Sequence, residues 1–159
     1  MKVEIKTDFG QVDNLLNNLK KELKNGKNGA RAGYLSSDVR DDGMQESRIA
    51  LANEFGVPEH NVPARPFMRN ARAKLDKKLK AVVDAGLEDQ LDMETLLARC
   101  GVAMRNEIKE SIDSNIPPAN KEATIRRKGS SHTLIDTEQM RGAVQSAIIT
   151  NGKEQLLPQ

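Results

Sequence analysis

The sequence predicts an α+β domain with three to four helices, one of them long, packed on a small, mainly antiparallel sheet. Apolar residues recur at helical spacing in four segments and alternate with polar residues in a few short ones. Clusters of proline, glycine and asparagine separate these segments. The chain has 159 residues, the length of one domain with a substantial core. We therefore expect a single domain over 1–150 and a polar C-terminal tail over 151–159.

Each expected helix has one apolar face. The helices cover residues 8–24, 46–55, 67–85 and 87–114. The apolar face of the long last helix carries Met93, Leu97, Cys100, Met104, Ile108 and Ile112. Gly56 is suited to end the second helix, and Pro117 and Pro118 end the fourth.

Short strands are expected at residues 3–5, 30–36 and 143–149, where side chains alternate in polarity or β-forming residues gather. Such a small sheet has open edges, which favour pairing with another copy of the chain.

Two irregular loops are expected. The stretch VPEHNVPARP contains three prolines, so it should be extended and stiff. Residues 116–136 form a long irregular loop before the last strand, longer than the roughly four to six residues usual in compact domains. A loop of this length has many main-chain hydrogen-bonding groups to satisfy, and we expect that another chain completes this part of the fold.

Composition narrows the class of protein. The net charge is only +2, with 25 basic and 23 acidic residues, which argues against a surface dedicated to nucleic acid. The single cysteine, Cys100, permits no intramolecular disulfide and fits a reducing compartment. The N-terminus does not read as a signal peptide and no segment reads as a membrane span, so we expect a soluble protein made in a cytoplasm.

No catalytic constellation is apparent in the sequence. His60 and His132 lie far apart in predicted loops, and neither has metal-ligand spacing with Cys100. Cys100 falls on the apolar face of the long helix, so we expect a small core residue. Phosphate-binding and nucleophile motifs are missing. We therefore expect no enzyme activity, no metal and no cofactor.

A basic cluster in the long loop has three readings. Arg126, Arg127 and Lys128 could belong to a solvated loop, to a subunit interface, or to a surface that contacts DNA phosphates. The cluster has no aromatic residue for stacking bases, which weakens a single-strand role.

The segment around Arg65 and Phe67 has two readings. In the first, Pro63 and Pro66 stiffen the chain and Phe67 anchors the start of the next helix in the core. In the second, Arg65 and Arg69 face the carboxylates of a neighbouring subunit.

Two stretches carry a family resemblance. ALANEFGVPEHNVPARPFMRNA (50–71) resembles the NEFG turn, IPARPF and helix of small virion-morphogenesis proteins of tailed phages. IPPANKEATIRRKGSSHTLIDTEQMRGAVQSAI (116–148) resembles their second pattern, PP…T…RKGS…PLIDTG followed by SI. The positions that match this second pattern are Pro117, Pro118, Thr124, Arg127, Lys128, Gly129, Ser130, Leu134, Ile135, Asp136, Thr137, Met140, Ser146 and Ile148, of which the last two are displaced by an insertion. The two blocks cover about 55 residues in the expected order.

The resemblance implies a structural protein of the tail-completion or head–tail joining (neck) group. It would act in the virion after synthesis in the host bacterial cytoplasm. Its partners would be copies of itself in a ring, of which a hexamer is one form, together with phage connector, neck and tail-tube proteins. The interface residues would be Arg65, Pro66, Phe67, Arg69, Thr124, Arg126, Arg127, Lys128, Asp136 and Thr137. Arg126, Arg127 and Lys128 would approach passing DNA if their loop points inward.

The sequence departs from the family pattern in three places. Thr133 replaces a proline, Met140 replaces a leucine, and Glu138 replaces the glycine after DT. The leucine-to-methionine change conserves volume. A positive φ at position 138 would strain glutamate, whereas a first helical turn capped by Asp136 would accept it, and we favour the helical turn.

Two other classes of function remain for comparison. A DNA-binding accessory protein would use the basic residues 126–128 and would bind DNA with a strong salt dependence. A regulatory or toxin-like enzyme would need an acid–base pair, which the sequence does not offer.

Overall fold

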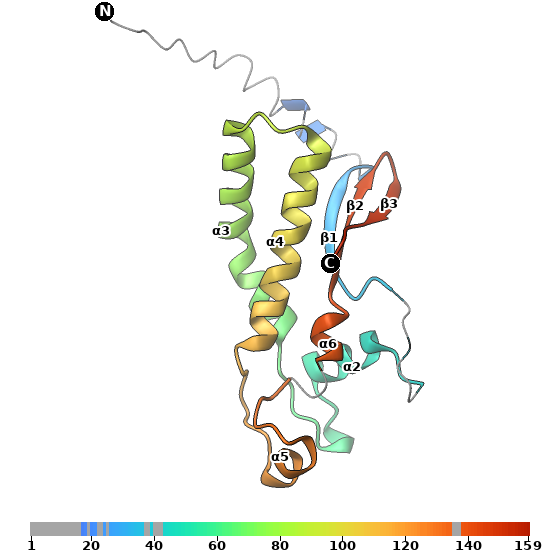
Figure 1. Cartoon of the computed structure of the whole chain (residues 1–159), viewed down its shortest axis with the longest axis vertical. Helices are drawn as coiled ribbons and strands as arrows, with labels where there is room; N and C mark the ends of the chain where they lie inside the picture. Colours follow the sequence, from blue (N-terminus) through green and yellow to red (C-terminus); the bar gives the residue numbers. More distant parts are fainter. Residues whose placement is uncertain are drawn as a thin grey trace, which may run out of the picture.

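Two long helices lie side by side, and the second of them also covers a three-stranded sheet (Figure 1). The helices are α3 (Phe67–Glu88) and α4 (Met93–Asp113), and α4 packs on strands β1 and β2 as well as on α3. The computed structural model describes residues 17–18, 20–21, 24, 26–36, 39, 43–134 and 138–159. The α+β class is confirmed.

The sheet is antiparallel throughout, in the order β1-β2-β3. Its strands are β1 (Gly29–Gly33), β2 (Gln145–Thr150) and β3 (Lys153–Leu156). The central strand β2 is buried over 146–148, whereas every residue of β3 is exposed. Strands were expected near the positions of β1 and β2, but β3 was not expected.

The predicted polar tail at 151–159 is wrong in its first half, because the chain turns back there as β3. Asn151 and Gly152 form the turn with φ values of 53° and 77°. An Asn-Gly pair adopts these left-handed conformations readily, and it is the commonest two-residue hairpin turn.

The helical hairpin also differs from the prediction. Helix α3 continues through Gly86 to Glu88, and α4 begins at Met93, so the molecule has two long helices in place of one. Asp92 caps α4, because its carboxylate accepts a hydrogen bond of 2.9 Å from the backbone N–H of Thr95. Gly86 is buried against Leu96, where a Cβ would lie only 2.5 Å from a Leu96 methyl group.

The long loop predicted over 116–136 contains a helix, α5 (Glu122–Lys128). Glu122 begins this helix and three basic residues end it, so its charges complement the helix dipole at both ends. Gly129 then ends it in a left-handed conformation, with φ of 70°. The remaining helical elements are α2 (Glu46–Phe55), the 3₁₀ turn η1 (Pro58–His60) and α6 (Gln139–Gly142).

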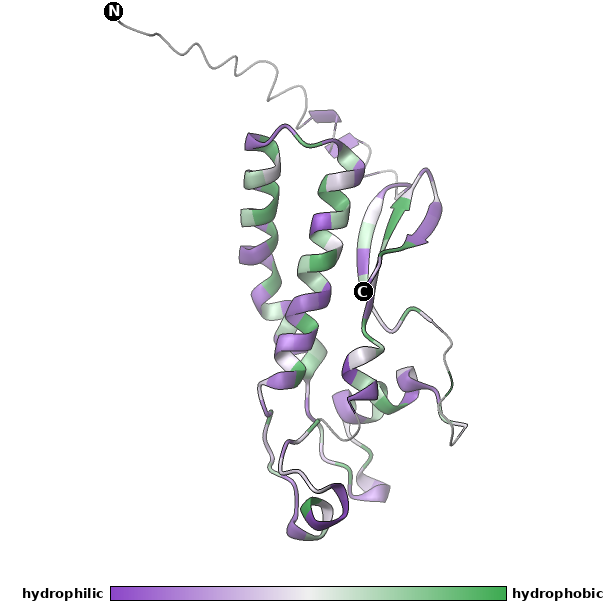
Figure 2. Ribbon diagram, in the orientation of Figure 1, coloured by the Kyte–Doolittle hydropathy of each residue, from purple (hydrophilic) through white to green (hydrophobic). Residues whose placement is uncertain are grey.

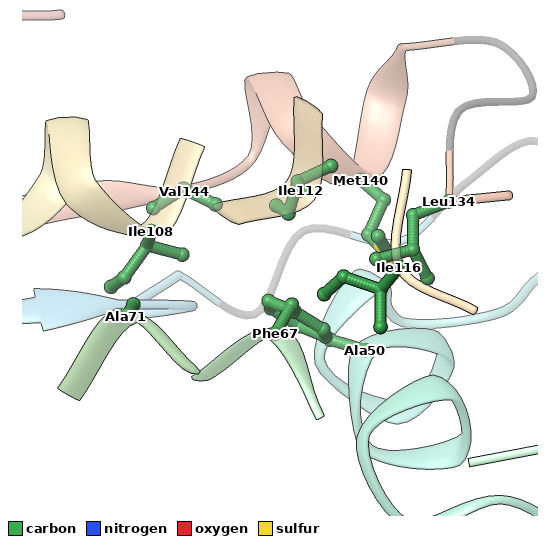
Figure 3. Close-up of a cluster of buried hydrophobic side chains, with 9 residues drawn as sticks. All are labelled: Ala50, Phe67, Ala71, Ile108, Ile112, Ile116, Leu134, Met140 and Val144. Carbon is green, nitrogen blue, oxygen red and sulfur yellow. The ribbon is translucent and has the colours of Figure 1, made fainter. Parts of the chain in front are cut away.

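The main hydrophobic core lies where α2, α3, α4 and α6 meet (Figure 3). Phe67 is fully buried in it, and Tyr34 meets the Phe67 ring edge-on with 6.5 Å between ring centroids. The core residues are Ala50, Phe67, Ala71, Ile108, Ile112, Ile116, Leu134, Met140 and Val144. Figure 2 shows hydrophobic residues along β2 as well. Cys100 is buried in α4 as predicted, and burial raises the pKa of its thiol.

At the N-terminal end, residues 17, 18, 20, 21 and 24 are helical. The rest of the predicted helix 8–24 is only partly described, and the predicted strand 3–5 lies outside the described residues. Among the described helices, none combines the length and the apolar character that crossing a membrane requires.

Candidate functional site

The NEFG segment makes a tight turn between α2 and the proline-rich connection. Gly56 has φ of 76°, and its N–H donates a 2.8 Å hydrogen bond to the carbonyl of Ala52. A Cβ at this position would lie 2.7 Å from the backbone nitrogen of Ala64. Only glycine satisfies both the conformation and the close approach.

Glu54 of the same segment holds the start of α3. Its buried carboxylate accepts hydrogen bonds from the backbone N–H of Met68 at 2.8 Å and from Nε of Arg69 at 3.0 Å. The Arg69 guanidinium also lies 5.5 Å from the centre of the Phe55 ring. Arg69 therefore has its carboxylate within the same chain, so the expectation that it faces a neighbouring subunit's carboxylate has no support.

Arg65 joins the two stretches that carry the family resemblance. Its side chain is buried, and Nε and Nη2 donate to the carbonyl oxygen of Pro118 at 3.1 and 2.9 Å. Nη2 also donates to Oδ1 of Asn120 at 3.0 Å. Burial lowers the pKa of Arg65, and among the described residues no carboxylate forms an ion pair with it. Arg65 thus connects the two stretches within the chain, and its place at a subunit or partner interface stays a prediction.

The segment around α5 is held by its own chain. Asn120 Nδ2 donates to the His132 carbonyl at 2.9 Å, and Lys128 Nζ donates to the same carbonyl at 3.1 Å. Arg126 pairs with Glu122 across one helical turn at 3.4 Å. The described part of this segment therefore forms many of its hydrogen bonds without a second subunit. These contacts do not support the expectation that another chain completes this part of the fold.

A groove of about 440 Å³ lies between α2, α5 and α6; we call it the mixed groove. Its charged and polar lining includes Arg48, Arg65, Arg127, Lys128, Thr133 and Glu138. Its apolar lining includes Met44, Ile49, Val62, Leu134 and Met140. The mixed groove thus places cationic groups next to aliphatic side chains.

A second surface, which we call the apolar face of α2, consists of Leu51 and Phe55 and the groove beside them. Leu51 is 60% exposed and Phe55 64% exposed, although both are large and apolar. The adjoining groove, of about 450 Å³, lies between α2 and the start of α3 and is also lined by Tyr34, Phe67 and Met68. Burial, with a smaller contribution from Glu46, raises the pKa of Tyr34, so its phenol stays protonated.

The predicted interface residues fall into separate places. Arg65 and Phe67 are buried, Pro66 precedes α3 as its N-cap residue, and Arg69 is exposed beside Glu54. Thr124, Arg127 and Lys128 line the mixed groove, whereas Arg126 does not. Asp136 and Thr137 lie outside the described residues. The sequence interpretation did not propose Leu51, Phe55 or Arg48 as site residues. For Leu51 and Phe55, the apolar residues on both sides of α2 were a signal.

The helical turn predicted at Glu138 is wrong. Glu138 lies in the left-handed region, with φ of 60° and ψ of −4°, and it precedes α6 as its N-cap residue. The glycine of the family pattern fits this conformation better than glutamate does.

The two histidines lie in different parts of the fold. His60 is exposed on η1, and Nε2 of His132 lies 3.0 Å from the carbonyl oxygen of Asp113. In the described part of the chain, no group of three or more histidine, cysteine or acidic side chains is placed to hold a metal ion.

Comparison with known proteins adds no relative: no family model, no curated protein and no solved structure matches this chain.

Proposed function

We propose that the chain is a non-catalytic structural protein of a tailed-phage virion, acting in tail completion or at the head–tail joint. It would form an oligomeric ring and contact connector, neck or tail-tube proteins through the apolar face of α2. The observation that carries this proposal is the exposure of Leu51 and Phe55 beside an apolar groove. Adjacent large apolar side chains on a surface favour a protein–protein contact.

The contact between the two motif stretches is a second support. Arg65 and Pro118 are 53 positions apart in the sequence, yet the Arg65 guanidinium binds the Pro118 carbonyl. The described residues of the two stretches therefore meet in one folded unit, which supports a shared structural role.

The edges of the sheet are a second candidate for a contact between chains. In the described part of the chain, β1 and β3 each pair on one side only, with β2. The outer edge of β3 carries charged residues, and Arg31 and Glu154 form an ion pair across the sheet. Such charges discourage indiscriminate edge pairing, so the apolar face of α2 is the stronger candidate for the contact.

The DNA-binding alternative receives less support from the basic residues of α5. Arg126 pairs with Glu122, Lys128 binds a backbone carbonyl, and Arg127 lines the mixed groove. A DNA surface would instead present such cations outward together.

Genetic removal in the encoding phage or prophage tests the proposal. We expect lysates without the protein to contain heads and tails that fail to join or tails of abnormal length, as seen by electron microscopy. The wild-type chain should restore infectious particles, whereas Leu51→Ser with Phe55→Ser should not. Leu156→Ser is the matched control, because Leu156 is 48% exposed but lies on β3. Normal virions without the protein would contradict the proposal.

A further inference from the structure

We propose that the mixed groove binds an acidic, aliphatic peptide segment of a protein partner, with Arg65 and Arg127 holding a carboxylate. This site is separate from the apolar face of α2, so the inference does not depend on the proposed function. The face of α2 would dock by hydrophobic contact, whereas the groove selects a partner by charge as well.

The floor of the groove has donors that form no hydrogen bond with the part of the chain that the structure describes. Arg65 is 5% exposed, and its three hydrogen bonds run through Nε and Nη2 to neutral oxygens, so Nη1 takes part in none of them. Thr133 is also buried at the groove, and its hydroxyl has no hydrogen-bond partner among the described residues. A buried cation without a counter-ion costs free energy, which an entering carboxylate would offset through a charge-assisted hydrogen bond.

The walls of the groove are positive. Arg48 and Arg127 line it, both are exposed, and neither forms an ion pair with a described residue. Glu138 is the one acidic side chain among the described residues that line the groove. An anionic group is therefore favoured over a cationic or neutral one.

The apolar lining decides between a peptide and a nucleic acid. Ile49, Val62 and Leu134 offer an aliphatic wall next to the cations. A phosphate backbone gains little from such a wall, and DNA phosphates are usually contacted by exposed side chains, whereas Arg65 is recessed. A segment that places an aspartate or glutamate beside a leucine or isoleucine satisfies both halves of the groove.

The test is an NMR titration of the ¹⁵N-labelled full chain with acetyl-Glu-Leu-Asp-Leu-amide. We expect saturable shifts at backbone amides lining the groove, and no saturable shifts with acetyl-Lys-Leu-Lys-Leu-amide. Arg127→Gln should weaken peptide binding about tenfold, the loss expected for one hydrogen bond to a charged group. Arg126→Gln is the matched control, because Arg126 neighbours Arg127 on α5 but does not line the groove, and it should leave affinity unchanged.

Three results would overturn the inference. One is the absence of saturable binding of the acidic peptide to the wild-type chain. Another is an equal loss of binding in the Arg126 and Arg127 variants, which would indicate diffuse attraction to a basic surface. The third is tighter binding of a short DNA duplex than of the peptide, with shifts at the same amides, which would make phosphate the ligand. Variants at Leu51 and Phe55 should bind the peptide normally, so failure here and failure of the proposed function are distinguishable.

Discussion

Replacing Glu138 with glycine is expected to stabilise the protein, because the native backbone at this position is left-handed. A residue with a Cβ pays about 1–2 kcal/mol for this conformation. Glycine avoids that cost, but its greater conformational entropy in the unfolded chain lowers the free energy of unfolding by about 0.4–1 kcal/mol. The difference is about 0 to 1.6 kcal/mol, so the free energy of unfolding should rise by about 0.8 kcal/mol. For a domain of this size, the corresponding rise in Tm is about 1–4 °C.

The assay is urea unfolding followed by circular dichroism, with thermal melts in parallel. Glu138→Gln is the matched control, since it removes the charge near Arg141 but keeps the Cβ and the backbone strain. Glu138 is exposed, so this control should change the free energy of unfolding by less than about 0.5 kcal/mol. If the glycine variant is less stable than wild type, or no more stable than the glutamine variant, the left-handed strain at this position is not real.

Three further variants test the packing that positions the two surfaces. Arg65→Gln should lower the free energy of unfolding by about 2–3 kcal/mol by removing hydrogen bonds from a charged donor, and hydrogen exchange should speed up over 118–132; unchanged exchange there would contradict the bridging role. Gly56→Ala should cost more than about 1 kcal/mol in urea unfolding, since the added Cβ meets backbone atoms and φ is positive; a neutral effect would refute the close approach. Lys78→Met should destabilise more than the double change with Glu107→Leu, because the single variant leaves the fully buried Glu107 carboxylate with only the more distant Lys74, at 3.8 Å, among the cations of the described residues. The pKa of Lys78 is raised, chiefly by its hydrogen bond to Glu107. The stabilisation that charged Lys78 gives the folded state is therefore complete below the unfolded pKa of 10.5 and is lost as pH rises through the higher folded pKa. Urea unfolding from neutral to alkaline pH should show this loss of stability in wild type and not in Lys78→Met.

Local sequence signals predicted the elements that have strong periodicity. Helices α3 and α4 each have an apolar face, and β2 is a buried run of apolar and small residues, so their existence could be inferred without long-range information. Helix α2 was also predicted, but its apolar residues are not confined to one face, since Ala50 is buried whereas Leu51 and Phe55 are exposed. The division between α3 and α4 was also signalled, since Asp92 and Thr95 have the spacing of a helix cap.

Helix α5 and strand β3 were missed although their signals were present, and the 3₁₀ turn η1 lies in a stretch that was predicted to be extended. Helix α5 has an acidic start, a basic end and Gly129 as its cap, but it is only seven residues long and has no buried face. Strand β3 follows the hairpin pair Asn151-Gly152, but all of its residues are exposed and it shows no apolar alternation. Periodicity detects only elements that bury a face, so short exposed elements must be inferred from caps and turns.

The candidate site depended on contacts that a single sequence does not reveal. Arg65 is paired with Pro118 across 53 residues, and nothing near Arg65 indicates that it is buried. Arg126 and Arg127 look alike in sequence, yet only Arg127 lines the mixed groove. The exposure of Leu51 and Phe55 also follows from how α2 packs, since the helix turns Ala50 into the core and leaves these two side chains at the surface.

Light scattering after size exclusion tests the central claim most directly. It should be performed on the protein alone and mixed with the neck and tail-tube proteins encoded beside it, for wild type and for Leu51→Ser with Phe55→Ser. We predict a ring or a co-eluting complex for wild type, and its loss in the double variant, whose circular dichroism should remain native because both side chains are mostly exposed. A wild-type protein that stays monomeric with every partner, or a double variant that assembles normally, would contradict the claim that the apolar face of α2 is a virion contact.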